Sequence, residues 1–103
     1  GTLTHISSWY FKGTDELPGA QVDLLIDRKD GVIHLCEVKF SNKEFVLTRE
    51  YAGRLRQKSS VFESATQTKK TVFQTLITTY PAIQNMHYLE NIQTEVCMDD
   101  LFD

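Results

Sequence analysis

The fold of this chain is decided by residues 21–40, which read QVDLLIDRKDGVIHLCEVKF. Polar and apolar residues alternate over residues 21–27 and again over 33–40, and this period of two is typical of β-strands. Residues 28–31, between the two runs, have the composition of a turn. We therefore predict a β-hairpin, in which alternate residues of each strand share a face. Glu37 and Lys39 then lie on one face, and Val38 points to the other.

The length of the hairpin loop decides whether Asp23 shares a face with Glu37. A two-residue loop at Asp30 and Gly31 would place Asp23 opposite Val38, on the wrong face. A three-residue loop over residues 29–31, closed by Gly31 in a left-handed conformation, places Asp23 opposite Glu37. We favour the three-residue loop because it gives the sheet one clean apolar face to bury. That face would hold Val22, Leu24, Ile26, Cys36, Val38 and Phe40, and the other would hold Asp23, Asp27, Ile33, Leu35, Glu37 and Lys39.

Asp23, Glu37 and Lys39 are the candidate site residues. Two carboxylates on adjacent strands can bind a divalent cation, and a lysine beside them can stabilise negative charge. The alternative is a solvated hairpin with scattered charges. Glu37 and Lys39 lie inside an apolar run, and the small residues Gly19 and Ala20 stand where a ligand could approach closely. Both observations favour a site.

The size and composition of the chain are those of one small domain spanning residues 1–103. The sequence contains no apolar run near the roughly 20 residues of a membrane span, so we expect no membrane association. Cys36 and Cys97 lack the spacing of a metal site, and we expect buried, reduced thiols in a cytoplasmic protein. The net charge of −3 does not by itself indicate a nucleic-acid-binding protein.

Positive charge is concentrated in the middle of the chain. Residues 41–70 carry seven Lys or Arg against three acids, whereas residues 71–103 carry no Lys or Arg and five acids. The basic segment could face phosphates, although an ordinary solvated helix surface explains it equally well. The candidate DNA-binding residues are Arg54, Lys58, Lys69 and Lys70. We expect Lys58 to act on DNA binding without affecting a metal site.

Beyond the hairpin, the pattern predicts a strand over residues 7–11, a helix over 48–65, a strand over 71–80 and a weak final strand over 92–96. Thr48 is the expected N-cap of the helix. The apolar stripe of the helix consists of Tyr51, Ala52, Leu55 and Phe62. We expect this stripe to be buried against Val22, Leu24, Val38 or Val72. The order β-β-β-α-β-β predicts an α/β domain with a mixed sheet and the helix on one face.

These residues also resemble a known family. Gly19-Ala20-Gln21-Val22-Asp23, the hairpin and Glu37-Val38-Lys39 together resemble the PD-(D/E)XK nuclease superfamily, which has the restriction-endonuclease-like fold. More narrowly, GAQVDLLIDR (19–28), LCEVKF (35–40) and DDLF (99–102) resemble the C-terminal domain of bacterial and archaeal AAA-type ATPases. The resemblance implies a restriction-endonuclease-like core over about residues 7–80 and an N-terminal ATPase domain in a longer chain.

The chain departs from the family pattern in one respect. The family usually places a further acid on a helix before the first strand. Only six residues precede Ser7, and none of them is acidic. Either that helix has been removed from this chain or this member lacks it, so we expect a core without its first helix.

The resemblance also implies roles for individual residues. Asp23 and Glu37 would coordinate Mg²⁺ or Mn²⁺, with the Val38 carbonyl as a further ligand. Lys39 would position or activate the attacking water and offset charge on the phosphoryl group. The implied activity is that of a metal-dependent deoxyribonuclease. The family also includes fused regulatory modules, so a non-catalytic nucleic-acid-binding, regulatory or oligomerisation domain stays open, as does self-association.

Overall fold

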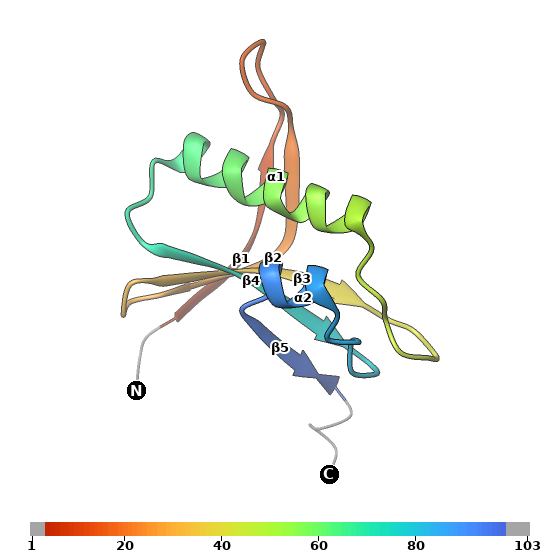
Figure 1. Ribbon diagram of the computed structural model, residues 1–103. Coiled ribbons are helices and arrows are strands. Elements are labelled where there is room, and N and C mark those ends of the chain that lie inside the picture. Colours follow the sequence, from red (N-terminus) through yellow and green to blue (C-terminus); the bar gives the residue numbers. More distant parts are fainter. Residues whose placement is uncertain (1–3, 99–103) are drawn as a thin grey trace.

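A computed structural model describes residues 4–98 as a five-stranded sheet with two helices (Figure 1). The strands are β1 (Thr4–Phe11), β2 (Ala20–Arg28), β3 (Val32–Lys39), β4 (Thr71–Thr78) and β5 (Thr94–Cys97), and they lie in this order in the sheet. The helices are α1 (Arg49–Thr66) and α2 (Met86–Asn91). β1, β2 and β3 are antiparallel neighbours, whereas β4 runs parallel to β3 and β5 parallel to β4. The predicted α/β class with a mixed sheet is confirmed.

The hairpin of β2 and β3 has the predicted register. Leu25 pairs with Leu35 and Asp27 pairs with Ile33, which leaves residues 29–31 as the loop. Gly31 has a φ of 93°, in the left-handed region that closes such a loop and that other residues rarely adopt. The three-residue loop is therefore confirmed.

Helix α1 begins and ends with local caps. The Thr48 hydroxyl accepts a hydrogen bond of 3.1 Å from the Tyr51 N–H, as expected of an N-cap. At the other end Gln67 adopts a left-handed conformation, and its N–H donates to the Glu63 carbonyl. The predicted helix over residues 48–65 is confirmed within one residue at each end.

Several boundaries differ from the sequence prediction, and one element was not predicted. β1 begins at Thr4, β4 ends at Thr78, and β5 comprises Thr94–Cys97. The element missed was α2, which has six residues and begins after an N-cap at Asn85. A helix of less than two turns leaves almost no periodic signal in a sequence. Residues 99–102, which contribute to the family resemblance, lie outside the described residues.

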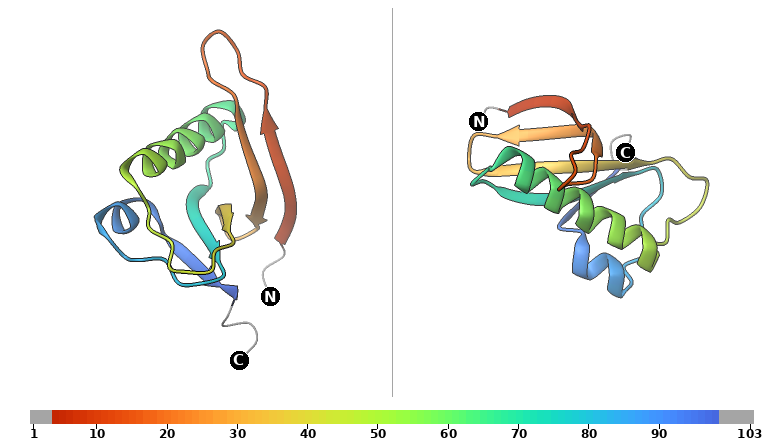
Figure 2. Two further views of the ribbon diagram at one scale, coloured as in Figure 1. Left: turned by 90° about the vertical axis from the view of Figure 1, so that its right-hand side faces the viewer. Right: turned by 90° about the horizontal axis from the view of Figure 1, so that it is seen from above.

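Both helices pack on the same face of the sheet (Figure 2). Under the first half of α1, Leu55 packs in a buried cluster with residues of β4, α2 and the neighbouring loops. Under its second half, Phe62 packs in a second cluster. The first cluster contains Leu47, Ala52, Leu55, Leu76, Ala82, Tyr88 and Ile92, and the second contains Val22, Leu25, Ile33, Leu35 and Phe62. No helix among residues 4–98 is long and apolar enough to cross a membrane.

The prediction of which face the helix buries was wrong. Leu35 and Ile33 lie beneath α1, so the residues that alternate with them, including Leu24 and Val38, point to the opposite face. Phe40, which the sequence placed on the buried face, is 72% exposed. Among the described residues, no helix covers that opposite face.

A β-bulge explains why Val22 nevertheless joins the core. Ser7 pairs with Leu25 but Trp9 pairs with Val22, so β2 uses three steps where β1 uses two. The extra residue turns Val22 to the same face as Leu25, where it packs with Phe62. The expectation that the helix stripe packs against Val22, Leu24, Val38 or Val72 is met by Phe62, which lies in the cluster of Val22 and Val72; Leu24 and Val38 are not part of it.

Gly19 has a role that differs from the one expected. A Cβ at this position would lie 2.9 Å from the Lys12 carbonyl oxygen and 3.0 Å from the Phe11 carbonyl oxygen. The small residue thus permits close approach of the two sides of the loop between β1 and β2. The packing of the protein's own backbone therefore explains Gly19, and this glycine is not evidence for a ligand site.

Candidate functional site

Glu37 lies on β3 beneath α1, and each of its carboxylate oxygens has a partner on that helix. Lys58 Nζ lies 2.6 Å from Oε1, and the Tyr51 hydroxyl donates a hydrogen bond of 3.3 Å to Oε2. Tyr51 and Lys58 are seven positions apart, so two helical turns bring them to the same side of α1. The Glu37 side chain is only 13% exposed. The carboxylate is therefore held in place and largely shielded from water.

Lys39 lies two residues further along β3 and shares this face, as predicted. Its ammonium lies 4.5 Å from the centroid of the Tyr51 ring and 5.8 Å from that of Phe45. The Arg54 guanidinium also lies against the Tyr51 ring, at 5.2 Å. Two cations thus flank one aromatic ring through cation–π contacts. Within residues 4–98, Lys39 has no carboxylate partner at salt-bridge distance.

These side chains line a cavity of about 310 Å³ between β3 and α1. Its lining consists of Glu37, Lys39, Tyr51, Arg54, Leu55 and Lys58. Three cationic side chains and one carboxylate give the cavity an excess of positive charge. An anion such as a phosphate group would find electrostatic stabilisation here.

Tyr51 remains a neutral hydrogen-bond donor in this site. Burial, followed by the charge of Glu37 and the hydrogen bond to it, raises the pKa of Tyr51 well above its ordinary value. Asp23 also raises this pKa, and Arg54 opposes the effect. The Asp23 carboxylate therefore lies within electrostatic range of the Tyr51 hydroxyl.

Asp23 lies at the margin of the site. The β2–β3 pairing ends at Leu24 and Cys36, one residue short of Asp23 and Glu37. Asp23 is exposed, accepts a hydrogen bond of 3.1 Å from Gln21 Nε2, and does not line the cavity. Asp23 falls inside the bulged stretch of β2 between Val22 and Leu25, so the regular alternation of faces does not apply to it.

The donor set suits a hard divalent cation such as Mg²⁺. Within residues 4–98, no three His, Cys, Asp or Glu side chains cluster as a set of metal ligands. Mg²⁺ is commonly held by only one or two carboxylates and keeps several of its waters. Asp23, Glu37 and the Val38 carbonyl are oxygen donors of this kind, so they fit the cation that the sequence implies.

The four predicted DNA-binding residues are divided between two regions. Arg54 and Lys58 line the cavity at the end of β3, whereas Lys70 pairs with Asp27 at 2.5 Å and donates to the Arg28 carbonyl. Thr71, the residue after Lys70, pairs with Val32, the first residue of β3. Lys39 is the last residue of β3, seven steps or about 23 Å further along. Lys69 precedes Lys70 and belongs to the distant group.

Lys58, which we expected to act on DNA binding without affecting a metal site, contacts the candidate metal ligand Glu37 directly. Sequence reasoning also missed the role of Tyr51, which it counted only as part of the apolar stripe. The spacing of Tyr51, Arg54 and Lys58 at intervals of three and four is the signal that places them on one side of the helix. That this side of α1 contacts Glu37 becomes apparent only from the way the helix packs on the sheet.

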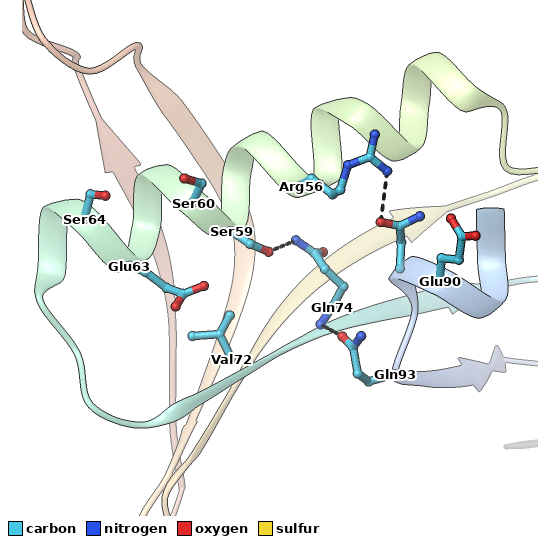
Figure 3. Close-up of a pocket in the computed structure, with 10 residues that line it drawn as sticks. Arg56, Ser59, Ser60, Glu63, Ser64, Val72, Gln74, Glu90 and Gln93 are labelled. Atoms are coloured by element: carbon cyan, nitrogen blue, oxygen red, sulfur yellow. Dashed lines mark hydrogen bonds between the residues drawn. The ribbon is translucent and has the colours of Figure 1, made fainter.

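A larger cavity of about 500 Å³ lies between α1, β4 and α2 (Figure 3). Hydrogen bonds between these elements cross it. Arg56 donates to Asn91 Oδ1, and the Gln74 side-chain amide donates to the Leu55 carbonyl and to Ser59 Oγ. Its walls thus hold α1 against β4 and α2. We attribute a structural role to this region.

Comparisons of the chain with protein-family models, curated proteins and solved structures found no match.

Proposed function

We propose that this chain is a Mg²⁺-dependent nuclease-like domain that hydrolyses phosphodiester bonds in DNA. The observation that carries the proposal is the cavity in which the shielded Glu37 carboxylate lies among Lys39, Arg54 and Lys58. A carboxylate that can hold a metal, next to cations that can hold phosphate, is a combination that suits metal-dependent phosphodiester hydrolysis.

The proposal includes a restriction-endonuclease-like core, joined in the full-length protein to an AAA-type ATPase domain. The arrangement of elements supports this core. An antiparallel β1-β2-β3 meander is followed by α1 and then by β4, which pairs parallel to β3. This arrangement agrees with the β-β-β-α-β order to which the sequence motif belongs.

Each residue has a proposed task. Asp23, Glu37 and the Val38 carbonyl would hold Mg²⁺, which when bound lowers the pKa of a coordinated water and stabilises negative charge. Lys39 would orient the attacking water and offset charge on the phosphoryl group. As water forms a bond to phosphorus, the bond to the leaving ester oxygen breaks. Arg54 and Lys58 would bind the DNA backbone, and Lys69 and Lys70 would contact DNA further along the sheet.

One observation favours a second function. The Glu37 carboxylate is already neutralised by Lys58, and such an ion pair can serve packing alone. In that case the domain would be a non-catalytic nucleic-acid-binding, regulatory or oligomerisation module of the ATPase.

Calorimetric titration with Mn²⁺ and plasmid cleavage, measured on the same proteins, separate the two functions. We expect Asp23→Ala and Glu37→Ala to lose both metal binding and cleavage. Lys39→Ala should retain metal affinity and lose cleavage, because its role is electrostatic and outside the metal ligands. Lys12→Ala is the control for removing a lysine, because Lys12 is exposed and lies outside both the cavity and the proposed DNA-binding residues.

The outcomes differ clearly between the two functions. An absence of Mn²⁺ binding and of cleavage by the wild-type chain, joined to its ATPase domain, would favour the non-catalytic module. Cleavage that survives Lys39→Ala would show that the chemistry lies elsewhere.

A further inference from the structure

The Lys58–Glu37 ion pair differs from the other ion pairs among the described residues. In the Lys70–Asp27 pair, the side chains are 36% and 39% exposed, and in the Arg28–Asp30 pair they are 34% and 38% exposed. Glu37, at 13%, is the most shielded carboxylate of the three. Its second oxygen is also engaged, by Tyr51. A shielded carboxylate with both oxygens occupied interacts strongly with its partners.

The position of Lys58 Nζ conflicts with a metal on the same carboxylate oxygen. Nζ lies 2.6 Å from Oε1, and a Mg²⁺ ion would lie about 2.1 Å from the oxygen that it coordinates. The ammonium and the divalent cation would then be only a few ångströms apart in a shielded cavity, where like charges repel strongly. Glu37 Oε1 can therefore serve either Lys58 or a metal ion, but not both in this arrangement.

Lys58 is able to move away. Its side chain is 31% exposed, and a lysine ammonium sits on a flexible four-carbon chain. The 310 Å³ cavity beside it offers space, with Lys39 and Arg54 on its walls. A phosphate group bound among these cations would provide the ammonium with a new partner.

We propose that Lys58 is an exchangeable counter-ion of Glu37. By default the Lys58 ammonium pairs with Glu37 and occupies the metal site, and when a divalent cation binds, the ammonium moves to pair with the phosphate of the substrate. This inference rests on the proposed function. It predicts that metal and DNA promote each other's binding, because each favours the arrangement in which Lys58 has left Glu37.

The test is a calorimetric titration with Mn²⁺ alone. Lys58→Met removes the charge and keeps an unbranched side chain, and Lys70→Met does the same at the distant Lys70–Asp27 pair. Thermal midpoints first establish that both variants fold. We expect Lys58→Met to bind Mn²⁺ about 5- to 10-fold more tightly than the wild type, because metal binding no longer breaks an ion pair. Lys70→Met should bind Mn²⁺ as the wild type does.

The results distinguish failure of this inference from failure of the proposed function. If the wild type binds Mn²⁺ through Glu37 but Lys58→Met binds it equally or less tightly, the counter-ion role is wrong and the metal site stands. If neither protein binds Mn²⁺, both proposals are wrong. If only Lys58→Met binds Mn²⁺, the default closure by Lys58 is supported directly.

A second measurement follows the ammonium itself. Surface lysines are acylated with and without saturating Mn²⁺, and the modified sites are quantified by mass spectrometry. We expect the labelling of Lys58 to rise several-fold when Mn²⁺ is present, while the labelling of Lys70 stays constant. Labelling of Lys58 that Mn²⁺ leaves unchanged or lowers would overturn the exchange.

Discussion

Replacing Leu55 with alanine tests the packing that places α1 over the site. Leu55 is 1% exposed and packs with Leu47, Leu76 and Tyr88 in the cluster between α1, β4 and α2. Removing such a side chain typically costs about 2–5 kcal/mol, through lost burial and the cavity that remains. The Leu55 carbonyl still accepts the hydrogen bond from Gln74, so only the side chain is tested.

The cost converts into a large change in the thermal midpoint. For 103 residues, an unfolding entropy of about 2.1 cal/mol/K per residue gives about 0.22 kcal/mol/K in total. A loss of about 3 kcal/mol should therefore lower the midpoint by about 14 °C. Urea denaturation followed by circular dichroism measures the same loss as a lower transition midpoint with an unchanged slope.

Leu89 provides the matched control, because it is 67% exposed on α2. Leu89→Ala should change stability by less than about 0.5 kcal/mol. If the two alanine variants unfold at the same midpoint, Leu55 is not buried between α1 and the sheet. The position of Tyr51 and Lys58 over Glu37 would then lose its support.

Two further predictions concern backbone space and ionisation. Gly53→Ala should stabilise the protein by about 0.5–1 kcal/mol, because the added Cβ would meet only Arg56, at 3.7 Å. Gly19→Ala should destabilise the protein, because the added Cβ would lie 2.9 Å from the Lys12 carbonyl oxygen. Urea titrations of the two variants measure both changes in stability. Burial, followed by the charge of Glu37, raises the pKa of Cys36 from 9.0 to about 11, so the folded protein holds this proton more tightly than the unfolded chain. The resulting stabilisation is complete below pH 9 and is lost as pH rises towards 11. Cys36→Ala should therefore flatten the decline of the unfolding free energy between pH 9 and 11. An equally steep decline in the wild type and the variant would contradict the raised pKa.

Local features explain what could be predicted from the sequence. The hairpin register follows from alternation over residues 21–27 and 33–40 and from Gly31, whose positive φ needs only its own backbone. The start of α1 follows from Thr48, whose hydroxyl bonds to an N–H three residues away. The shared face of Glu37 and Lys39 follows from their spacing on one strand. Each of these depends on residues that are close together in the chain.

Only the tertiary structure decided which face of the sheet is buried and what meets Glu37. Both faces of the hairpin carry apolar residues, Leu25 and Leu35 on one and Leu24 and Val38 on the other, so alternation alone could not choose between them. The choice came from contacts over long distances in the chain, in which α1 and β4 pack on Leu25 and Leu35. That choice sets Lys58 against Glu37, 21 positions away, and so joins a carboxylate and its counter-ion that no local pattern connects.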